Sequence, residues 1–89
     1  MKQDVLILLN DNFKVLNVIY DNSIMIGEEF YCPLSQGEMA KIVDMARMTF
    51  SRNLQELINI GFVEPRSTTL RKYILTSRGE QVIKTIRKL

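Results

Sequence analysis

Apolar side chains between positions 4 and 22 recur with the period of an α-helix. At 100° per residue most of them share one broad face, and polar side chains occupy the opposite face. Asn12 intrudes on the apolar face, whereas Ile7 and Val18 fall on the polar one, where they are incidental or meet a second subunit. The run at positions 5–9 alone also fits a strand, but the longer pattern favours a helix over residues 4–22. The apolar face of this helix consists of Val5, Leu8, Leu9, Phe13, Val15, Leu16, Ile19 and Tyr20.

The segment after this helix is rich in turn-forming residues. Residues 21–29 include Gly27 and several polar side chains, so we expect a connector. Residues 30–34 then have the composition of a short strand. Pro33 ends that strand, because proline has no N–H to donate to a neighbouring strand.

Local signals place the start of the next helix at Ser35. Ser35 and Glu38 have the spacing of a capping box, in which each side chain accepts a hydrogen bond from the backbone N–H of the other residue. Leu34 and Met39 stand at the two positions of a hydrophobic staple around that box. Apolar side chains then continue at helical spacing as far as Val43.

A short break at residues 44–46 precedes a second helix over residues 47–60. Gly61 supplies the signal that ends it. One arc of this helix is apolar and predicts a buried face made of Phe50, Leu54, Leu57 and Ile60. The opposite arc predicts an outward face that carries Met48, Ser51, Arg52 and Gln55.

Two short strands follow this helix. Residues 62–66, with Pro65 near their end, and residues 71–75 have the composition of strands and flank a polar turn at 67–69. They predict a β-hairpin over residues 62–75.

A last helix over residues 77–88 closes the chain. Thr76 or Ser77 caps it, and Ser77 with Glu80 has the spacing of a second capping box. Its apolar stripe is formed by Val82, Ile83, Ile86 and Leu89. The whole pattern predicts a mainly α chain with a small β-hairpin, an α+β fold, in a single domain of residues 1–89.

Composition narrows the chemistry. The 89 residues are 46% hydrophobic and 25% charged, which is typical of a globular domain. A single cysteine, Cys32, forms no internal disulfide, which fits a reducing cytoplasm. Without histidine, the chain has no usual zinc site and no pairing of a nucleophile with a base. We therefore expect no bound metal, no cofactor and no enzymatic activity. Cys32 is expected to be inert and half-buried, and no apolar run is long enough to span a membrane.

Charge is distributed unevenly along the chain. Up to residue 46, three basic residues stand against seven acidic ones, a net charge of −4. From residue 47 onward, nine basic residues stand against three acidic ones, a net charge of +6. This basic half suggests a polyanionic partner, although an unevenly charged solvated surface explains it equally well.

The run PLSQGEMAKIVDMARMTFSRNLQELINIGFV, at residues 33–63, resembles the DNA-binding domain of the cyclic-AMP receptor protein family. The residues after it, YILTSRG at 73–79, are similar to the entry into the last helix of MarR-type repressors. The positions that match the first family are Pro33, Leu34, Ser35, Glu38, Ala40, Val43, Arg47, Thr49, Phe50, Ser51, Arg52, Leu54, Leu57, Gly61, Phe62 and Val63.

The resemblance implies a winged helix-turn-helix that binds double-stranded DNA. Residues 35–60 would form the helix-turn-helix, with the helix at 47–60 in the major groove and the hairpin at 62–75 as the wing. On that helix, Arg47 and Arg52 could each bind a guanine through O6 and N7. The implied DNA-binding residues are Arg47, Met48, Thr49, Ser51, Arg52 and Gln55 on the helix, Ser35 and Gln36 before it, and Arg66, Ser67, Thr68, Thr69, Arg71 and Lys72 on the wing.

The chain departs from the first family's pattern in four respects. Met48 replaces a glutamate that commonly contacts bases there, so the family's preferred half-site is not implied. Asp44 replaces the glycine of the turn, and Ala46 replaces the Ser or Thr that caps the second helix, at a cost of roughly 1 kcal/mol. Only about thirty residues precede the match, too few for a nucleotide-binding barrel, so we expect no cyclic nucleotide and no other small-molecule ligand.

The leading hypothesis from the sequence is a transcriptional regulator that binds DNA as a homodimer. The first helix, 4–22, is the expected dimer contact because its apolar face is broad and little else in the chain covers it. One alternative is a winged-helix adaptor that binds proteins, since the fold alone does not decide function. Another is a DNA-binding factor of plasmid or phage replication or excision.

Overall fold

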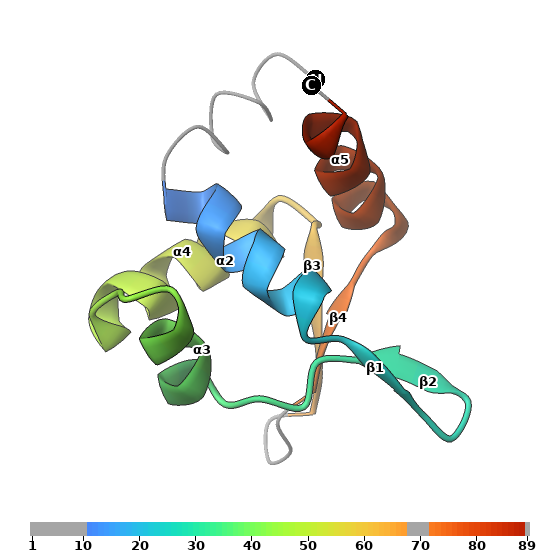
Figure 1. The fold of residues 1–89 in the computed structure, drawn as a ribbon, viewed down its shortest axis with the longest axis horizontal. Coiled ribbons are helices and arrows are strands. Elements are labelled where there is room, and N and C mark those ends of the chain that lie inside the picture. Colours follow the sequence, from blue (N-terminus) through green and yellow to red (C-terminus); the bar gives the residue numbers. More distant parts are fainter. Residues whose placement is uncertain (1–10, 68–71, 89) are drawn as a thin grey trace.

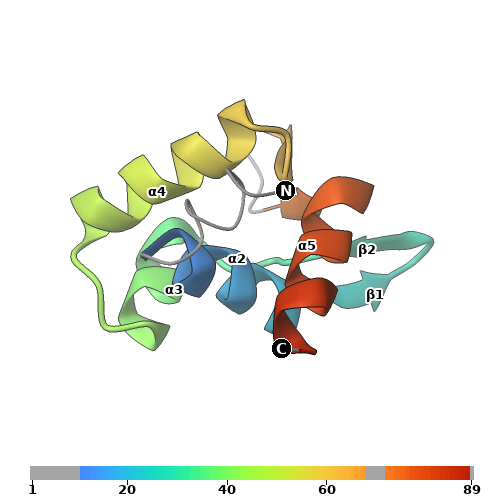
Figure 2. The same ribbon diagram turned by 90° about the horizontal axis from the view of Figure 1, so that it is seen from above.

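The computed structural model describes residues 11–67 and 72–88 of the chain, without the side chains of Arg66, Ser67 and Lys72. Four helices and two antiparallel hairpins in these ranges form a small α+β fold, which confirms the expected class (Figures 1 and 2). No helix in the described ranges has the length and apolar character to cross a membrane. The elements are α2 (Asp11–Asp21), β1 (Ile24–Ile26), β2 (Glu29–Tyr31), α3 (Gln36–Ile42), α4 (Arg47–Asn59), β3 (Val63–Ser67), β4 (Lys72–Leu75) and α5 (Ser77–Arg87).

Helix α2 is the centre of the core, and it packs against α3, α4, α5 and β4 (Figure 1). Val15, Leu16 and Ile19 are fully buried on it, as the apolar pattern predicts. The prediction for Val18 was wrong: its side chain is 3% exposed and belongs to the core. The reason is that α3 lies against the side of α2 that the isolated helical pattern assigned to solvent. The part of the predicted helix at residues 4–10 lies outside the described residues.

Asn12 explains the polar interruption of the apolar face. The residue is 1% exposed, and its Nδ2 donates a hydrogen bond of 2.8 Å to Oε2 of Glu56 on α4. A buried amide is tolerated when such a partner exists. Asn12 therefore links the start of α2 to the last turns of α4.

The connector expected over residues 21–29 contains a strand and a hairpin turn that the sequence pattern did not predict. The segment contains β1, the turn and the first residue of β2, which pair in antiparallel register with Met25 opposite Phe30. Gly27 has φ +65°, the left-handed conformation that a tight hairpin turn requires and glycine adopts without strain. The predicted strand at 30–34 is shorter than expected: β2 ends at Tyr31, and Cys32 alone continues as a bridge to Tyr73.

Helix α3 begins as predicted. The Ser35 hydroxyl accepts a hydrogen bond of 3.1 Å from the Glu38 N–H, and the Ser35 N–H donates one of 3.0 Å to the Glu38 carboxylate. Met39 and Ala40 are buried behind the cap. Asp44 then adopts φ 54°, so this aspartate takes the left-handed conformation of the turn between the two helices.

Helix α4 begins at Arg47 and has Ala46 at its N-cap without a side-chain hydrogen bond, as its sequence implies. We expect Ala46→Ser to raise the free energy of unfolding by about 1 kcal/mol, because the hydroxyl would accept from a free N–H of the first turn. Urea denaturation measures the change. An unchanged midpoint would contradict the expected cap, and Ser35→Ala, which removes the existing cap of α3, provides the opposite-sign reference.

The second hairpin connects α4 to α5. Strands β3 and β4 pair from Val63 opposite Leu75, and the register shifts between Pro65 and Ser67. Of the two expected caps of the last helix, the structure selects Thr76. Its hydroxyl accepts from the Gly79 N–H at 3.1 Å and donates to the Gly61 carbonyl at 2.5 Å.

An arginine at the C-terminal end of α5 contacts α2. The Arg87 guanidinium donates to Asn17 and, at 2.6 Å, to the Asp21 carboxylate. The same group lies 4.9 Å from the centre of the Tyr20 ring, within the range of a cation–π contact. One arginine thus joins two elements that are far apart in the sequence.

Candidate nucleic-acid interface

Helix α4 presents two chemically distinct faces. Phe50, Leu54 and Leu57 are at most 2% exposed and hold the helix against the core. The predicted fourth member of that face, Ile60, is partly buried at its end. The outward face consists of Arg47, Met48, Ser51, Arg52 and Gln55, all of which are exposed. The sequence prediction of the two faces is therefore confirmed.

The two arginines of the outward face have no partner among the described residues. Within the described ranges, neither Arg47 nor Arg52 forms a salt bridge or a side-chain hydrogen bond with another residue. An unpaired guanidinium at the surface keeps all five N–H donors available to a ligand. The geometry therefore leaves both side chains able to contact a planar, acceptor-rich group such as a phosphate or a guanine edge.

The remaining candidates on α4 differ in availability. Met48 is 87% exposed, the most exposed large apolar side chain among the described residues. Gln55 donates to Oδ1 of Asn59 at 3.0 Å, a surface contact that a ligand could replace. Thr49 is only half-buried at the edge of the face, and its carbonyl accepts from Asn53.

The two candidates before α4 lie at the start of α3. Ser35 is engaged in the capping box, although its hydroxyl hydrogen remains a donor. Gln36 donates to the Tyr73 hydroxyl at 3.3 Å and so contacts strand β4. Both positions are held in place by internal hydrogen bonds, and neither points freely into solvent.

A hollow of about 490 Å³ separates the start of α3 from the start of α4. It brings together Ser35 and Arg47, as the sequence predicted, and adds Lys41, which the sequence analysis did not select. Lys41 is exposed in the last turn of α3. No motif position marks it, so only its proximity to Arg47 in the fold identifies it as a further cation beside the interface.

The predicted wing residues are placed only in part. Arg66 and Ser67 belong to β3 and Lys72 to β4, and Ser67 pairs with Lys72. Thr68, Thr69 and Arg71 lie outside the described residues. The hairpin therefore exists where the sequence predicts it, and the contribution of its tip to an interface stays a prediction.

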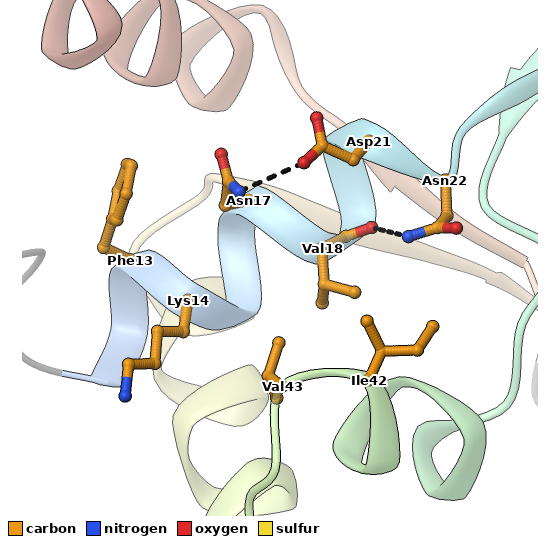
Figure 3. Close-up of a pocket in the computed structure, with 8 residues that line it drawn as sticks. All are labelled: Phe13, Lys14, Asn17, Val18, Asp21, Asn22, Ile42 and Val43. Carbon is orange, nitrogen blue, oxygen red and sulfur yellow. Dashed lines mark hydrogen bonds between the residues drawn. The ribbon is translucent and has the colours of Figure 1, made fainter.

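A second hollow, of about 430 Å³, lies between α2 and α3 (Figure 3). Val18, Ile42 and Val43 supply much of its apolar lining, and Lys14 and Asp21 stand at its rim. No residue of α4 contributes to it. This hollow is therefore separate from the candidate interface.

Cys32 is fully buried, not half-buried as expected. Burial raises the pKa of its thiol, and the nearby Glu38 carboxylate adds to the rise, while a hydrogen bond from the Leu34 backbone opposes it. A thiol with a raised pKa carries little of the reactive thiolate. No group of three or more acidic, cysteine or histidine residues able to hold a metal ion occurs in the part of the chain that the structure describes.

Comparison with protein-family models, with curated proteins and with solved structures finds no match for this chain.

Proposed function

We propose that the chain is a winged helix-turn-helix protein that binds double-stranded DNA through α4. The observation that carries this proposal is the outward face of α4, where Arg47 and Arg52 are exposed and unpaired among the described residues. A rigid base supports that face, because α4 is anchored by its buried side chains and α3 meets it through a short turn at Asp44.

In the proposed complex α4 lies in the major groove. An arginine there can donate two hydrogen bonds to O6 and N7 of a guanine. Ser51 and Gln55 would form further hydrogen bonds with base edges or phosphates. Lys41 and the hairpin β3–β4 would contact the sugar-phosphate backbone of the DNA. Such contacts raise the affinity but add little sequence preference. The exposed Met48 would meet an apolar group such as the methyl of a thymine.

We further propose that the protein acts in the cytoplasm as a homodimeric transcriptional regulator. A dimer would place two α4 helices in successive major grooves about 34 Å apart. The expectation that the first helix joins the two copies depended on an uncovered apolar face. Over residues 11–21 that face is buried within the chain, and residues 4–10 lie outside the described ranges. The described part of the first helix therefore leaves little apolar surface for contact with a second copy.

Selection from a pool of random duplexes, followed by a gel-shift titration at several salt concentrations, tests the proposal. We expect a preferred site and an affinity that falls steeply with salt, with a slope of about 0.9 per phosphate contact. Failure to bind any duplex at low salt would overturn DNA binding.

A second candidate function is a protein-binding adaptor that uses the same face. The observation that favours it is Met48, an 87% exposed apolar side chain in the middle of the outward face. Exposed methionines adapt well to protein surfaces. An adaptor would bind a protein partner with little salt dependence and would lose that binding on Met48→Glu.

A further inference from the structure

The hairpin β1–β2 carries the largest group of exposed apolar side chains in the described chain. It projects from the body of the molecule (Figures 1 and 2). Ile24 is 50% exposed, Met25 62%, Ile26 43% and Phe30 47%. Because side chains alternate along a strand, Ile24 and Ile26 lie on one face of the hairpin, and Met25 lies on the other beside its cross-strand partner Phe30. Both faces of the hairpin are therefore apolar and exposed, as at an interaction site.

Strand β1 is also the open edge of this hairpin. On one side it pairs with β2, whose continuation at Cys32 bridges to Tyr73 on β4. On its other side, β1 has no partner strand in the described part of the chain. Proteins usually protect such an edge with a charge, a proline or a covering element. Residues 22–27, NSIMIG, contain neither a charge nor a proline.

We propose that β1 pairs antiparallel with β1 of a second copy of this chain across a two-fold axis. The axis passes through Met25, which faces Met25 of the other copy, and Ile24 faces Ile26. Glu28, the first charge after β1, then lies opposite Asn22 and not opposite another acid. The strand therefore places apolar side chains opposite apolar ones and brings no like charges together, as a symmetric contact between two copies requires. The result is a four-stranded sheet in the order β2, β1, β1, β2.

The position of the hairpin suits a dimer that leaves the candidate interface accessible. The hairpin and the start of α4 lie at opposite ends of the molecule in both views (Figures 1 and 2). A contact through β1 therefore covers none of Arg47, Ser51 or Arg52. The side chains available for burial are few, and the contact falls short of the roughly 1,200 Å² of a stable interface. We therefore expect a weak dimer whose population rises with concentration.

The test measures the mass of the protein in solution without DNA, so its outcome does not depend on DNA binding. In sedimentation analysis, the wild-type mass should rise with concentration from one chain of 10.4 kDa towards two. Met25→Lys should stay a monomer, because it places two like charges opposite each other at the axis. Ile42→Lys is the matched control: it adds the same charge at a 57% exposed apolar residue on α3, and it should dimerise like the wild type.

Mixing two variants separates the pairing from a defect in folding. Met25→Lys and Met25→Glu should each be monomeric with an unchanged circular dichroism spectrum. An equal mixture should regain the dimer, because the axis places the introduced ammonium group of one copy against the introduced carboxylate of the other. A wild type that stays monomeric at the highest concentration would overturn the proposal. So would a Met25→Lys variant that dimerises like the wild type, or folded variants whose mixture stays monomeric.

Discussion

Replacing Gly79 with alanine should lower the free energy of unfolding by about 3 kcal/mol, through overpacking against a fixed backbone. A Cβ at this position would lie 2.2 Å from the carbonyl oxygen of Phe62 and 3.0 Å from its carbon. The atoms that it meets belong to the backbone, so no side-chain rotation relieves the clash. That backbone is held in place, because Phe62 is fully buried and its oxygen accepts from the Thr76 N–H at 3.0 Å.

Gly37→Ala is the matched control for this substitution. Gly37 lies in the first turn of α3, and a Cβ there would have only the Ser35 hydroxyl oxygen near it, at 3.9 Å. The added methyl should therefore raise the free energy of unfolding by up to about 1 kcal/mol, since glycine is the less favourable helix residue. Urea denaturation compares both variants with the wild type. A stabilising change in both variants would show that helix propensity, and not the contact with Phe62, decides the effect.

The contact at Gly79 gives a physical meaning to the residues that resemble the MarR-type pattern. Thr76 is needed because its hydroxyl caps α5, and Gly79 is needed because α5 crosses the Phe62 carbonyl at that point. Thr76 follows from the sequence as one of two possible helix caps, whereas Gly79 is marked only by the resemblance. The cause of the spacing is a contact between α5 and the residue that precedes β3, which no local pattern contains.

Features that depend on neighbouring residues could be predicted from the sequence. The capping box at Ser35 and the two faces of α4 follow from spacings of four residues or fewer. Such signals act through the helix backbone itself, so they survive whatever the rest of the fold does. The outward face of α4, predicted in this way, carries Arg47 and Arg52, the two side chains on which the proposed interface depends.

Features that depend on distant residues could not be predicted. Val18 is buried because α3 packs beside it, and the buried Nδ2 of Asn12 has an acceptor in Glu56, which reaches it from α4. The hairpin β1–β2 was not predicted for another reason. Each strand has three residues, too few for a period of two to stand out from the turn residues around it.

Replacing both Arg47 and Arg52 with alanine should weaken binding to a selected duplex by about 100-fold or more. Each guanidinium that contacts a guanine or a phosphate contributes about 1–3 kcal/mol to such a complex. The logarithmic salt slope should also become shallower by about one for each arginine that binds a phosphate. The fold should be unaffected, because both side chains are exposed and unpaired within the described residues. Fluorescence anisotropy over a salt series measures the affinity and the slope together.

The control must remove the same charge from a different face. Lys84→Ala with Lys88→Ala does so, because both lysines are exposed on α5 or at its end, away from α4 (Figure 2). We expect this pair to change the affinity by roughly threefold or less at physiological salt, where distant surface charges are screened. An equal loss for both pairs would mean that net charge alone attracts the DNA, and the assignment of α4 as the recognition helix would be wrong. A loss confined to the arginine pair, with a changed preferred site, would mean that α4 contacts the bases.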